Sequence, residues 1–329
     1  LDNDESVQIT VMTPYPLDDG VHELQKERLE VIRLKPKFNI RKIRYFLNDY
    51  FYAKDVSKKF KEQDFDLLLI ETFDQAIFIN SLDKNLYERT AIRIHSTSET
   101  EYTMFSNRFV NRLRRFLIQN KVSKKIKWVL STNSYHIKFA KKHYFDGNLI
   151  DIGEKNFFVL PNPVNVLKPD TYEITEKIKI FNLGRMDLFG NNQKGFTDFI
   201  YALKLLPNSV LSRFEVTIVG KGDMRESLIS LCKDLNNVTF VESMQHGDVI
   251  KQLKLSDVVF LPSRYEGLSM FALEGLATGN VCLFSRTGGL IDMVEDNGIL
   301  FEPQNIESIV SALTELSQLS NDEIIKMKE

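Results

Sequence analysis

Residues 256–292 read SDVVFLPSRYEGLSMFALEGLATGNVCLFSRTGGLID and contain two apolar runs on either side of a helix-length segment. Residues 258–261 and 281–284 are short apolar runs bounded by polar or turn-forming residues, a pattern typical of buried strands. Ser269 and Gly279 suit the two ends of one helix between these strands. A strand, a helix and a second strand form the crossover unit of a parallel sheet, whose ligands bind beyond the carboxyl ends of the strands.

Two glutamates make this unit a candidate binding site. Glu266 lies in the loop before the predicted helix, whose first N–H groups suit an anion such as a diphosphate. Glu274 is the only charged residue among residues 270–278, and a carboxylate on an apolar helix is costly unless a partner satisfies it. The hydroxyl groups of a ribose would satisfy it; a salt bridge on a partly exposed face is the alternative. Gly275 costs about 1 kcal/mol relative to alanine inside a helix, which indicates a close backbone approach there.

The same residues resemble a known motif. EGLSMFALE, at residues 266–274, is similar to the Glu-x7-Glu motif of retaining glycosyltransferases with the GT-B fold, and the flanking PSRYEG and ATGNVCLFSRTGGLIDMV agree with it. The chain therefore resembles glycosyltransferase family 4 (glycosyl transferases group 1), whose members use nucleotide-sugar donors. The resemblance implies an α/β protein with two Rossmann-like domains whose parallel sheets face a central cleft.

The length of 329 residues predicts two domains. Residues 1–168 would form an N-terminal, acceptor-side domain, and residues 169–329 a C-terminal domain that binds the nucleotide sugar. The polar, proline-containing residues 166–175 would link them. The family's first strand and glycine-rich loop are not evident at the start of the chain, and its final helix is not evident at the end. We therefore expect both ends to be clipped relative to the family.

In the second domain, GR at residues 184–185 and KG at residues 194–195 resemble a motif pair of the family. The resemblance implies that Arg185 and Lys194 hold the donor diphosphate, through contacts worth about 1.5–3 kcal/mol each. They would also stabilise the charge that develops on the leaving nucleotide. The full set expected to bind the donor is Gly184, Arg185, Lys194, Glu266, Gly267, Leu268, Ser269 and Glu274.

His95 follows an apolar run at residues 91–94, at the carboxyl end of a predicted strand, where ligand contact is favoured. It resembles the family's histidine that lies near the donor sugar; a loop histidine bonded to the backbone is the alternative. The resemblance further implies that Glu266 binds sugar hydroxyl groups near the reacting carbon. The expected catalytic residues are His95, Arg185, Lys194 and Glu266.

No metal or cofactor motif is convincing in this sequence. GKGDMR at residues 220–225 has two of the three glycines of GxGxxG and is weak evidence for NAD. DFD at residues 64–66 matches an Asp-x-Asp metal motif by letters alone. The resemblance implies that the nucleotide sugar is a substrate, that no cofactor is used, and that Arg185 and Lys194 handle the phosphate charge without a metal.

Residues 102–145 contain many cations and no Asp or Glu. The part at residues 109–118 interleaves arginines with apolar residues, as in a basic amphipathic helix at an anionic membrane surface. An anionic acceptor groove and a merely solvated face are the alternatives. Nucleic acid is not expected, because the net charge is −2 and no recognised binding module is present. The candidate cations are Arg108, Arg112, Arg114, Arg115, Lys121, Lys124 and Lys125.

The sequence thus predicts a retaining, metal-independent hexosyltransferase in bacterial surface polysaccharide or glycoconjugate synthesis, with a glycan, lipid-linked or protein acceptor. A GT-B nucleotide-sugar epimerase and a non-catalytic partner subunit that binds sugar nucleotide or membrane are the alternatives. Cys232 and Cys282 belong to no CxxC pair and read as reduced core residues. We find no apolar run of about 18 residues and no signal-peptide pattern, and we expect a cytoplasmic protein, peripheral on the inner face of the membrane.

Overall fold

The computed structural model describes residues 7–14, 24–26, 28–37, 44–71, 76–95, 116, 125–142, 156–169 and 171–329. Contacts between residues divide the chain into two compact units. Unit 1 comprises Leu1–Ile94, Ser98–Leu130 and Phe139–Phe158, and unit 2 comprises His95–Thr97, Ser131–Lys138 and Val159–Glu329. The domain boundary expected between residues 168 and 169 stays a prediction, as does the arrangement of two sheets about a central cleft.

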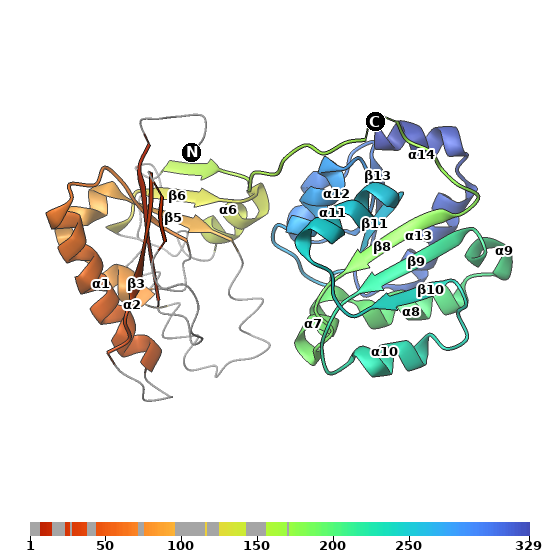
Figure 1. The fold of residues 1–329 in the computed structure, drawn as a ribbon, viewed down its shortest axis with the longest axis horizontal. Coiled ribbons are helices and arrows are strands. Elements are labelled where there is room, and N and C mark those ends of the chain that lie inside the picture. Colours follow the sequence, from red (N-terminus) through yellow and green to blue (C-terminus); the bar gives the residue numbers. More distant parts are fainter. Residues whose placement is uncertain are drawn as a thin grey trace. The chain divides into compact units, whose positions relative to one another are not determined.

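Unit 2 is built on a six-stranded sheet (Figure 1). Its strands are β8 (Ile178–Leu183), β9 (Phe214–Val219), β10 (Val238–Val241), β11 (Val258–Leu261), β12 (Val281–Ser285) and β13 (Gly298–Phe301). They lie in the order β10-β9-β8-β11-β12-β13, and all neighbouring pairs are parallel. The strand order reverses between β8 and β11, as in doubly wound nucleotide-binding folds.

Helices connect the strands of unit 2 and cover both faces of its sheet (Figure 1). They are α7 (Leu188–Lys194), α8 (Phe196–Leu205), α9 (Asn208–Leu211), α10 (Arg225–Leu231), α11 (His246–Leu255), α12 (Met270–Ala277), η5 (Gly288–Met293), α13 (Ile306–Gln318) and α14 (Asn321–Lys328). The crossover expected from the sequence is β11, α12 and β12, with β11 and β12 paired in parallel.

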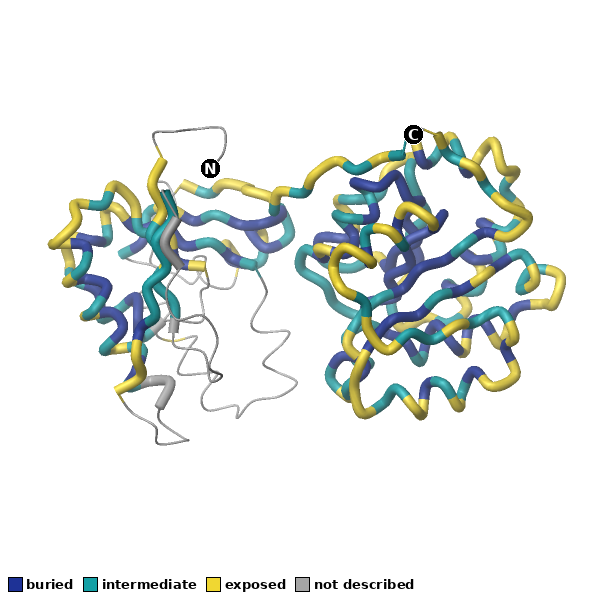
Figure 2. Tube along the Cα trace, in the orientation of Figure 1, coloured by how far each residue is buried: buried dark blue, intermediate teal, exposed yellow. Residues whose placement is uncertain are grey.

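The side chains of β11 alternate between two hydrophobic cores. Val258 and Phe260 lie in the core that contains residues of α8 and α13, whereas Val259 and Leu261 lie in the core that contains residues of α11 and α12. All four are buried, and Figure 2 shows the central strands in dark blue. Burial on both faces explains why the run at residues 258–261 is apolar throughout and does not alternate with polar residues.

Unit 1 contains two sheets. A four-stranded sheet has the order β4-β5-β6-β7, formed by β4 (Leu68–Ile70), β5 (Thr90–Ile94), β6 (Trp128–Ser131) and β7 (Asn156–Val159). A three-stranded sheet has the order β1-β3-β2, formed by β1 (Ile9–Pro14), β2 (Leu24–Lys26) and β3 (Leu29–Leu34). β1 is parallel and β2 antiparallel to β3.

The helical elements described in unit 1 are α1 (Arg44–Glu62), α2 (Ala76–Ser81), η1 (Lys84–Arg89) and α6 (Ser134–Ala140), the last of which extends into unit 2. Ala53, Val56 and Phe60 recur at helical spacing along α1 and are buried together with Ile79 and Ile92. This apolar stripe packs α1 onto the core of the unit.

The α/β class and the parallel sheets predicted from the sequence are confirmed. The predicted strand at residues 258–261 has the observed bounds, and the predicted strands at residues 281–284 and 91–94 each fall one residue short of β12 and β5. The expectation that both chain ends are clipped stays a prediction.

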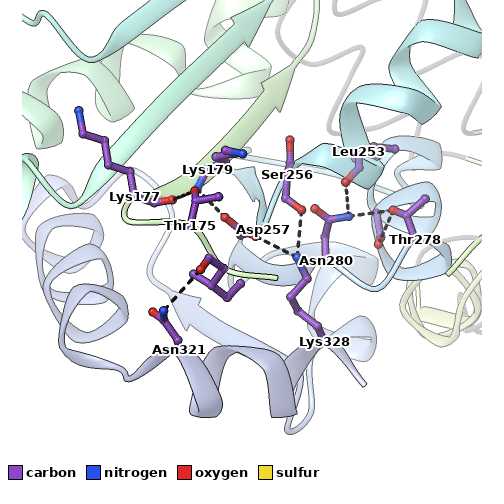
Figure 3. Close-up of polar contacts among 12 residues, drawn as sticks. Thr175, Lys177, Lys179, Leu253, Ser256, Asp257, Thr278, Asn280, Asn321 and Lys328 are labelled. Atoms are coloured by element: carbon purple, nitrogen blue, oxygen red, sulfur yellow. Dashed lines mark hydrogen bonds and ion pairs between the residues drawn. The ribbon is translucent and has the colours of Figure 1, made fainter. Parts of the chain in front are cut away.

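A buried ion pair anchors α14 at the amino end of β11 (Figure 3). The side chains of Lys328 and Asp257 are 5% and 6% exposed, and Lys328 Nζ lies 3.1 Å from Asp257 Oδ1. Lys328 Nζ also donates to the carbonyl oxygen of Ser256, and Asp257 Oδ2 accepts from the backbone N–H of Lys179 at the start of β8. Burial lowers the pKa of the Lys328 amino group, although the Asp257 carboxylate opposes this shift.

Candidate functional site

The chain segments that leave β8 and β11 lie at the point where the strand order of unit 2 reverses. β8 is followed by Gly184 and Arg185, and β11 is followed by residues 262–269, which we call the Glu266 loop, and then by α12. In open α/β sheets, ligands bind outside the carboxyl ends of the strands at this point. The predicted donor residues are therefore carried by the segments expected to form a ligand site.

Lys194 and Glu266 are in direct contact. Nζ of Lys194, the last residue of α7, lies 2.5 Å from Glu266 Oε2, and the two side chains are 19% and 10% exposed. The hydroxyl of Ser263 lies 3.2 Å from the same carboxylate oxygen and donates to it. Two residues predicted from separate motifs thus form one charged pair with little exposure to water.

Glycines make room for this pair. A Cβ on Gly184 would stand 3.0 Å from Lys194 Cγ, so the absence of a side chain lets the lysine stem pass. Gly195 has a φ of +67°, and a Cβ there would stand 2.2 Å from the carbonyl oxygen of Pro262, the first residue of the Glu266 loop. Gly195 is therefore required for the close approach and for the left-handed backbone, whereas Gly184 leaves a tight fit for the lysine side chain.

Arg185 lies at the same sheet edge with its side chain 63% exposed. Its guanidinium carbon is 5.1 Å from the centre of the Phe189 ring, and Nη1 is 3.9 Å from Asp187 Oδ2. Exposed contacts of both kinds are weak, about 1 kcal/mol or less. The side chain is therefore easily reoriented toward an anionic ligand.

α12 begins and contacts its neighbour as its sequence suggests. The hydroxyl of the N-cap residue Ser269 accepts from the backbone N–H of Ala272 at 3.2 Å. A Cβ on Gly275 would stand 2.6 Å from Val259 Cγ2, so the close approach predicted for this glycine is confirmed and is to β11. Gly279, with a φ of +74°, follows the helix end.

Glu274 has a partner that sequence reasoning missed. Its side chain is 13% exposed, and Oε1 lies 2.9 Å from Nε2 of His246, the first residue of α11, whose side chain is 75% exposed. His246 follows β10, whose carboxyl end lies at the same sheet edge. Its position after that strand is the sequence signal that could have identified it as a site residue. The alternative to ribose binding, a polar partner on a partly exposed face, is therefore present in the structure, and ribose binding by Glu274 stays a prediction.

A glycine turn after β12 supports the Glu266 loop. Gly288 has a φ of +52°, and a Cβ there would stand 1.7 Å from the carbonyl oxygen of Glu266. The backbone N–H of Gly289 donates to the carbonyl oxygen of Gly267 at 3.0 Å. At this distance only glycine fits at position 288. Together, the contacts of Gly288 and Gly289 hold the backbone at Glu266 and Gly267.

The remaining predicted residues are His95 and the cations among residues 108–125. His95 follows β5, is half-buried and is grouped with unit 2. Its backbone carbonyl oxygen would stand 2.9 Å from a Cβ on Gly267, so its backbone lies against the Glu266 loop. The approach of its side chain to a donor sugar stays a prediction. In unit 1, Lys125 Nζ donates to Asn80 Oδ1 at 2.8 Å and to the Tyr87 hydroxyl at 2.9 Å. Six candidate cations lie outside the described residues: Arg108, Arg112, Arg114, Arg115, Lys121 and Lys124.

Among the residues that the structure describes, no group of three or more His, Cys, Asp or Glu side chains is placed to hold a metal ion. Burial raises the pKa of the Cys232 thiol to about 11 and also raises that of Cys282, which disfavours the reactive thiolates. Among the described helices, none has both the length and the apolar character needed to cross a bilayer.

Known proteins resemble this chain in sequence. Residues 168–327 match the family model described as glycosyl transferases group 1. An uncharacterized glycosyltransferase of Haemophilus influenzae is 25% identical over 284 residues, which cover 84% of this chain and 74% of the relative. An uncharacterized glycosyltransferase of Methanocaldococcus jannaschii is 37% identical over 142 residues, 41% of this chain, and the match spans 34% of that relative.

The fold is shared with solved structures. An Escherichia coli structure described as trehalose-6-phosphate bound with UDP-2-fluoro glucose superposes with a TM-score of 0.71 at 12% identity, covering 97% of this chain and 86% of that one. The six-stranded parallel sheet, its reversal between β8 and β11, and the motifs at that reversal agree with this likeness. The chain therefore has the GT-B fold of glycosyltransferases, and its residues 168–327 carry the sequence pattern of glycosyl transferases group 1.

Proposed function

We propose that this protein is a retaining glycosyltransferase that moves a sugar from a nucleotide diphosphate sugar to an acceptor hydroxyl. The observation that carries the proposal is the contact between Lys194 and Glu266 where the strand order reverses, at 2.5 Å. The family match of residues 168–327 supports it. The UDP-2-fluoro glucose bound by the E. coli structure of the same fold supports a sugar nucleotide as the ligand.

The donor-binding roles follow from the charges at this edge. Lys194 and Arg185 bind the diphosphate, and the backbone N–H groups of residues 267–269, near the start of α12, add to this. Glu274 binds the ribose hydroxyl groups in exchange for its contact with His246. Glu266 accepts hydrogen bonds from hydroxyl groups of the donor sugar, and His95 approaches the same sugar.

In the reaction, the bond between the anomeric carbon and the diphosphate oxygen breaks, and a bond to the acceptor oxygen forms on the same face. The proton of the acceptor hydroxyl passes to the leaving phosphate, which acts as the base. Lys194 and Arg185 stabilise the negative charge on that phosphate. Two cations supply this stabilisation, so we expect no requirement for a divalent metal.

The finer assignments belong to the same proposal. The acceptor is a glycan, a lipid-linked molecule or a protein, in bacterial surface polysaccharide or glycoconjugate synthesis. We also propose that the cations of residues 102–145 attract the protein to the anionic inner face of the membrane. Flotation with liposomes tests this; failure to float with anionic lipid would remove the membrane assignment.

The first test is a thermal-shift screen against UDP, GDP, ADP and CMP, in which the nucleotide of the donor should raise the unfolding temperature. With that donor, Lys194→Ala and Arg185→Ala should each lower turnover by about 10²-fold or more, because each removes a cation that stabilises the leaving phosphate. Near-normal rates in both variants would refute the site.

Lys221→Ala is the matched control for these variants. Lys221 follows β9 at the same sheet edge, but its side chain is 63% exposed and pairs with Glu242 at 3.8 Å. Its loss should leave turnover unchanged. Products formed from donor alone would indicate an epimerase, and nucleotide binding without turnover of any acceptor would indicate a non-catalytic subunit.

A further inference from the structure

The Glu266 loop is held in place by Arg264, whose side chain uses all three guanidinium nitrogens. Nε and Nη2 donate to the two carboxylate oxygens of Asp198 at 3.0 and 2.9 Å, and Nη1 donates to Asn192 Oδ1 at 2.7 Å. The side chains of Arg264 and Asp198 are 26% and 12% exposed. A bidentate pair of this kind fixes both distance and orientation.

The contacts of Arg264 are with residues on both sides of Lys194 in the sequence. Asn192 lies in α7, and Asp198 lies in the first turn of α8. In addition, the backbone N–H of Arg264 donates to the carbonyl oxygen of Gln193 at 2.8 Å. Arg264 is two residues from Glu266, so one residue ties the Glu266 loop to the chain on both sides of Lys194.

The opposite side of the Glu266 loop is held differently. The hydroxyl of Ser285 donates to the carbonyl oxygen of Ser263 at 2.5 Å, and that of Thr287 donates to the carbonyl oxygen of Arg264 at 3.4 Å. These bonds, with the glycine turn, hold the loop to the end of β12. They do not reach α7 or α8. Gly195 packs against the carbonyl oxygen of Pro262, and the hydrogen bonds described from the loop backbone and the Arg264 side chain to the chain around Lys194 all come from Arg264. We therefore expect the Arg264 side chain to set the fine spacing between Glu266 and Lys194.

We propose that Arg264 is a positioning residue that sets the geometry of Lys194 and Glu266, so that turnover depends on it more than donor binding does. The proposal rests on the glycosyltransferase function proposed above. Misplacing a reacting group by about 1 Å costs up to 10²-fold in rate. Diphosphate binding by an exposed arginine, a long lysine side chain and several N–H groups tolerates such a shift.

The test compares Arg264→Met with Arg264→Lys. Arg264→Met should lower kcat by roughly 30- to 100-fold and change KM for the donor by less than about threefold. Arg264→Lys keeps the positive charge next to Asp198 but cannot make the two parallel hydrogen bonds of the planar guanidinium group. Its kcat should therefore lie between those of Arg264→Met and the parent protein. Asp198→Asn weakens the same contact from its other partner, with a smaller change of volume. It should likewise lower kcat and leave KM for the donor nearly unchanged.

Arg286→Met is the matched control. Arg286 follows β12 at the same sheet edge and pairs with Glu302 at 3.1 Å, but the side chains are 49% and 59% exposed. Its kcat should stay within about twofold of the parent protein. A comparable loss of kcat in this variant would overturn the proposal, because any arginine at this edge would then have the same effect.

A second readout needs no turnover. Hydrogen exchange measured by mass spectrometry should be faster in Arg264→Met for residues 262–269 and unchanged for β9 and β12. Unchanged exchange in the loop, or faster exchange throughout unit 2, would overturn the positioning role. Absence of turnover in the parent protein would refute the proposed function, and the exchange comparison would still decide whether Arg264 positions the loop.

Discussion

At the scale of single residues, Glu266 pairs with Lys194, the cation that we propose binds the donor diphosphate. Its carboxylate lies 2.5 Å from Lys194 Nζ, and both side chains are mostly buried. A diphosphate that binds Lys194 must compete with this carboxylate, although the same carboxylate is expected to hold the donor sugar. Affinity for the nucleotide portion and turnover should therefore respond in opposite directions to loss of this charge.

Glu266→Gln tests this opposition. Removing the negative charge should tighten binding of the free nucleoside diphosphate by roughly tenfold or more, because a mostly buried pair is stronger than an exposed one, which is worth about 1 kcal/mol or less, and should lower kcat. Isothermal titration with the nucleoside diphosphate measures the first effect. Weaker binding in this variant would show that Glu266 supports the Lys194 contact with phosphate and does not compete with it.

The residues of the candidate site divide by the kind of signal that identifies them. Lys194 and Glu266 stand in local motifs, so the sequence alone points to them. The partners of Arg264 and Glu274 are Asp198 and His246, which lie 66 and 28 positions away in the chain. Such pairs depend on which strands are neighbours in the sheet, and no local pattern contains that information.

At the scale of elements, the contact between α12 and β11 shows packing overriding helix propensity. Gly275 lies inside α12, where alanine would be favoured by about 1 kcal/mol. The backbone of α12 instead approaches β11 so closely that a Cβ would stand 2.6 Å from Val259 Cγ2. A β-branched side chain on a central strand has little freedom to move away.

Gly275→Ala should therefore destabilise the protein, by about 1–3 kcal/mol from overpacking. Denaturant unfolding measures the loss. Val259→Ala in the same chain should relieve part of it, giving a double variant more stable than the sum of the two single effects. Gly247→Ala is the control: Gly247 lies in α11 with no atom within 4 Å of an added Cβ, and this change should be neutral or slightly stabilising.

The central strand β11 was predicted with its observed bounds and β12 with one residue fewer, whereas β2, β13 and α14 were not predicted. β2 has three residues, and the residues of β13 at the sheet edge are half-buried except for Phe301. Short edge strands bury too little apolar surface to produce a clear pattern. The strand order also lies beyond the sequence pattern, because it depends on pairings between distant segments.

At the scale of the whole molecule, Lys328 and Asp257 join the last helix to the sheet edge opposite the candidate site. Lys328→Met alone should destabilise the protein by about 3–5 kcal/mol, because it leaves the buried Asp257 carboxylate without its cation. Lys328→Met combined with Asp257→Asn should recover most of this loss. Denaturant unfolding of the parent protein, Lys328→Met, Asp257→Asn and the double variant measures the coupling energy between the two side chains. Equal losses of stability in Lys328→Met and in the double variant would contradict this prediction.

The same pair predicts a dependence on pH. Burial holds the pKa of Lys328 below 10.5 in the folded protein, so the unfolded chain binds this proton more tightly. The contribution of this group to stability therefore rises with pH between its folded pKa and about 10.4, its value in the unfolded chain. Unfolding free energies across this alkaline range should rise in the parent protein relative to the double variant, and a parallel course would exclude the effect.

The contact of Gly288 with Glu266 has a consequence for the order of assembly. Translation delivers Glu266 first, but the surface on which its peptide rests emerges with Gly288 and Gly289, after β12. A nascent chain that ends before these glycines lacks that support, however complete its preceding strands are. The backbone at Glu266 should therefore take its final conformation only after Gly288 and Gly289 have been synthesised.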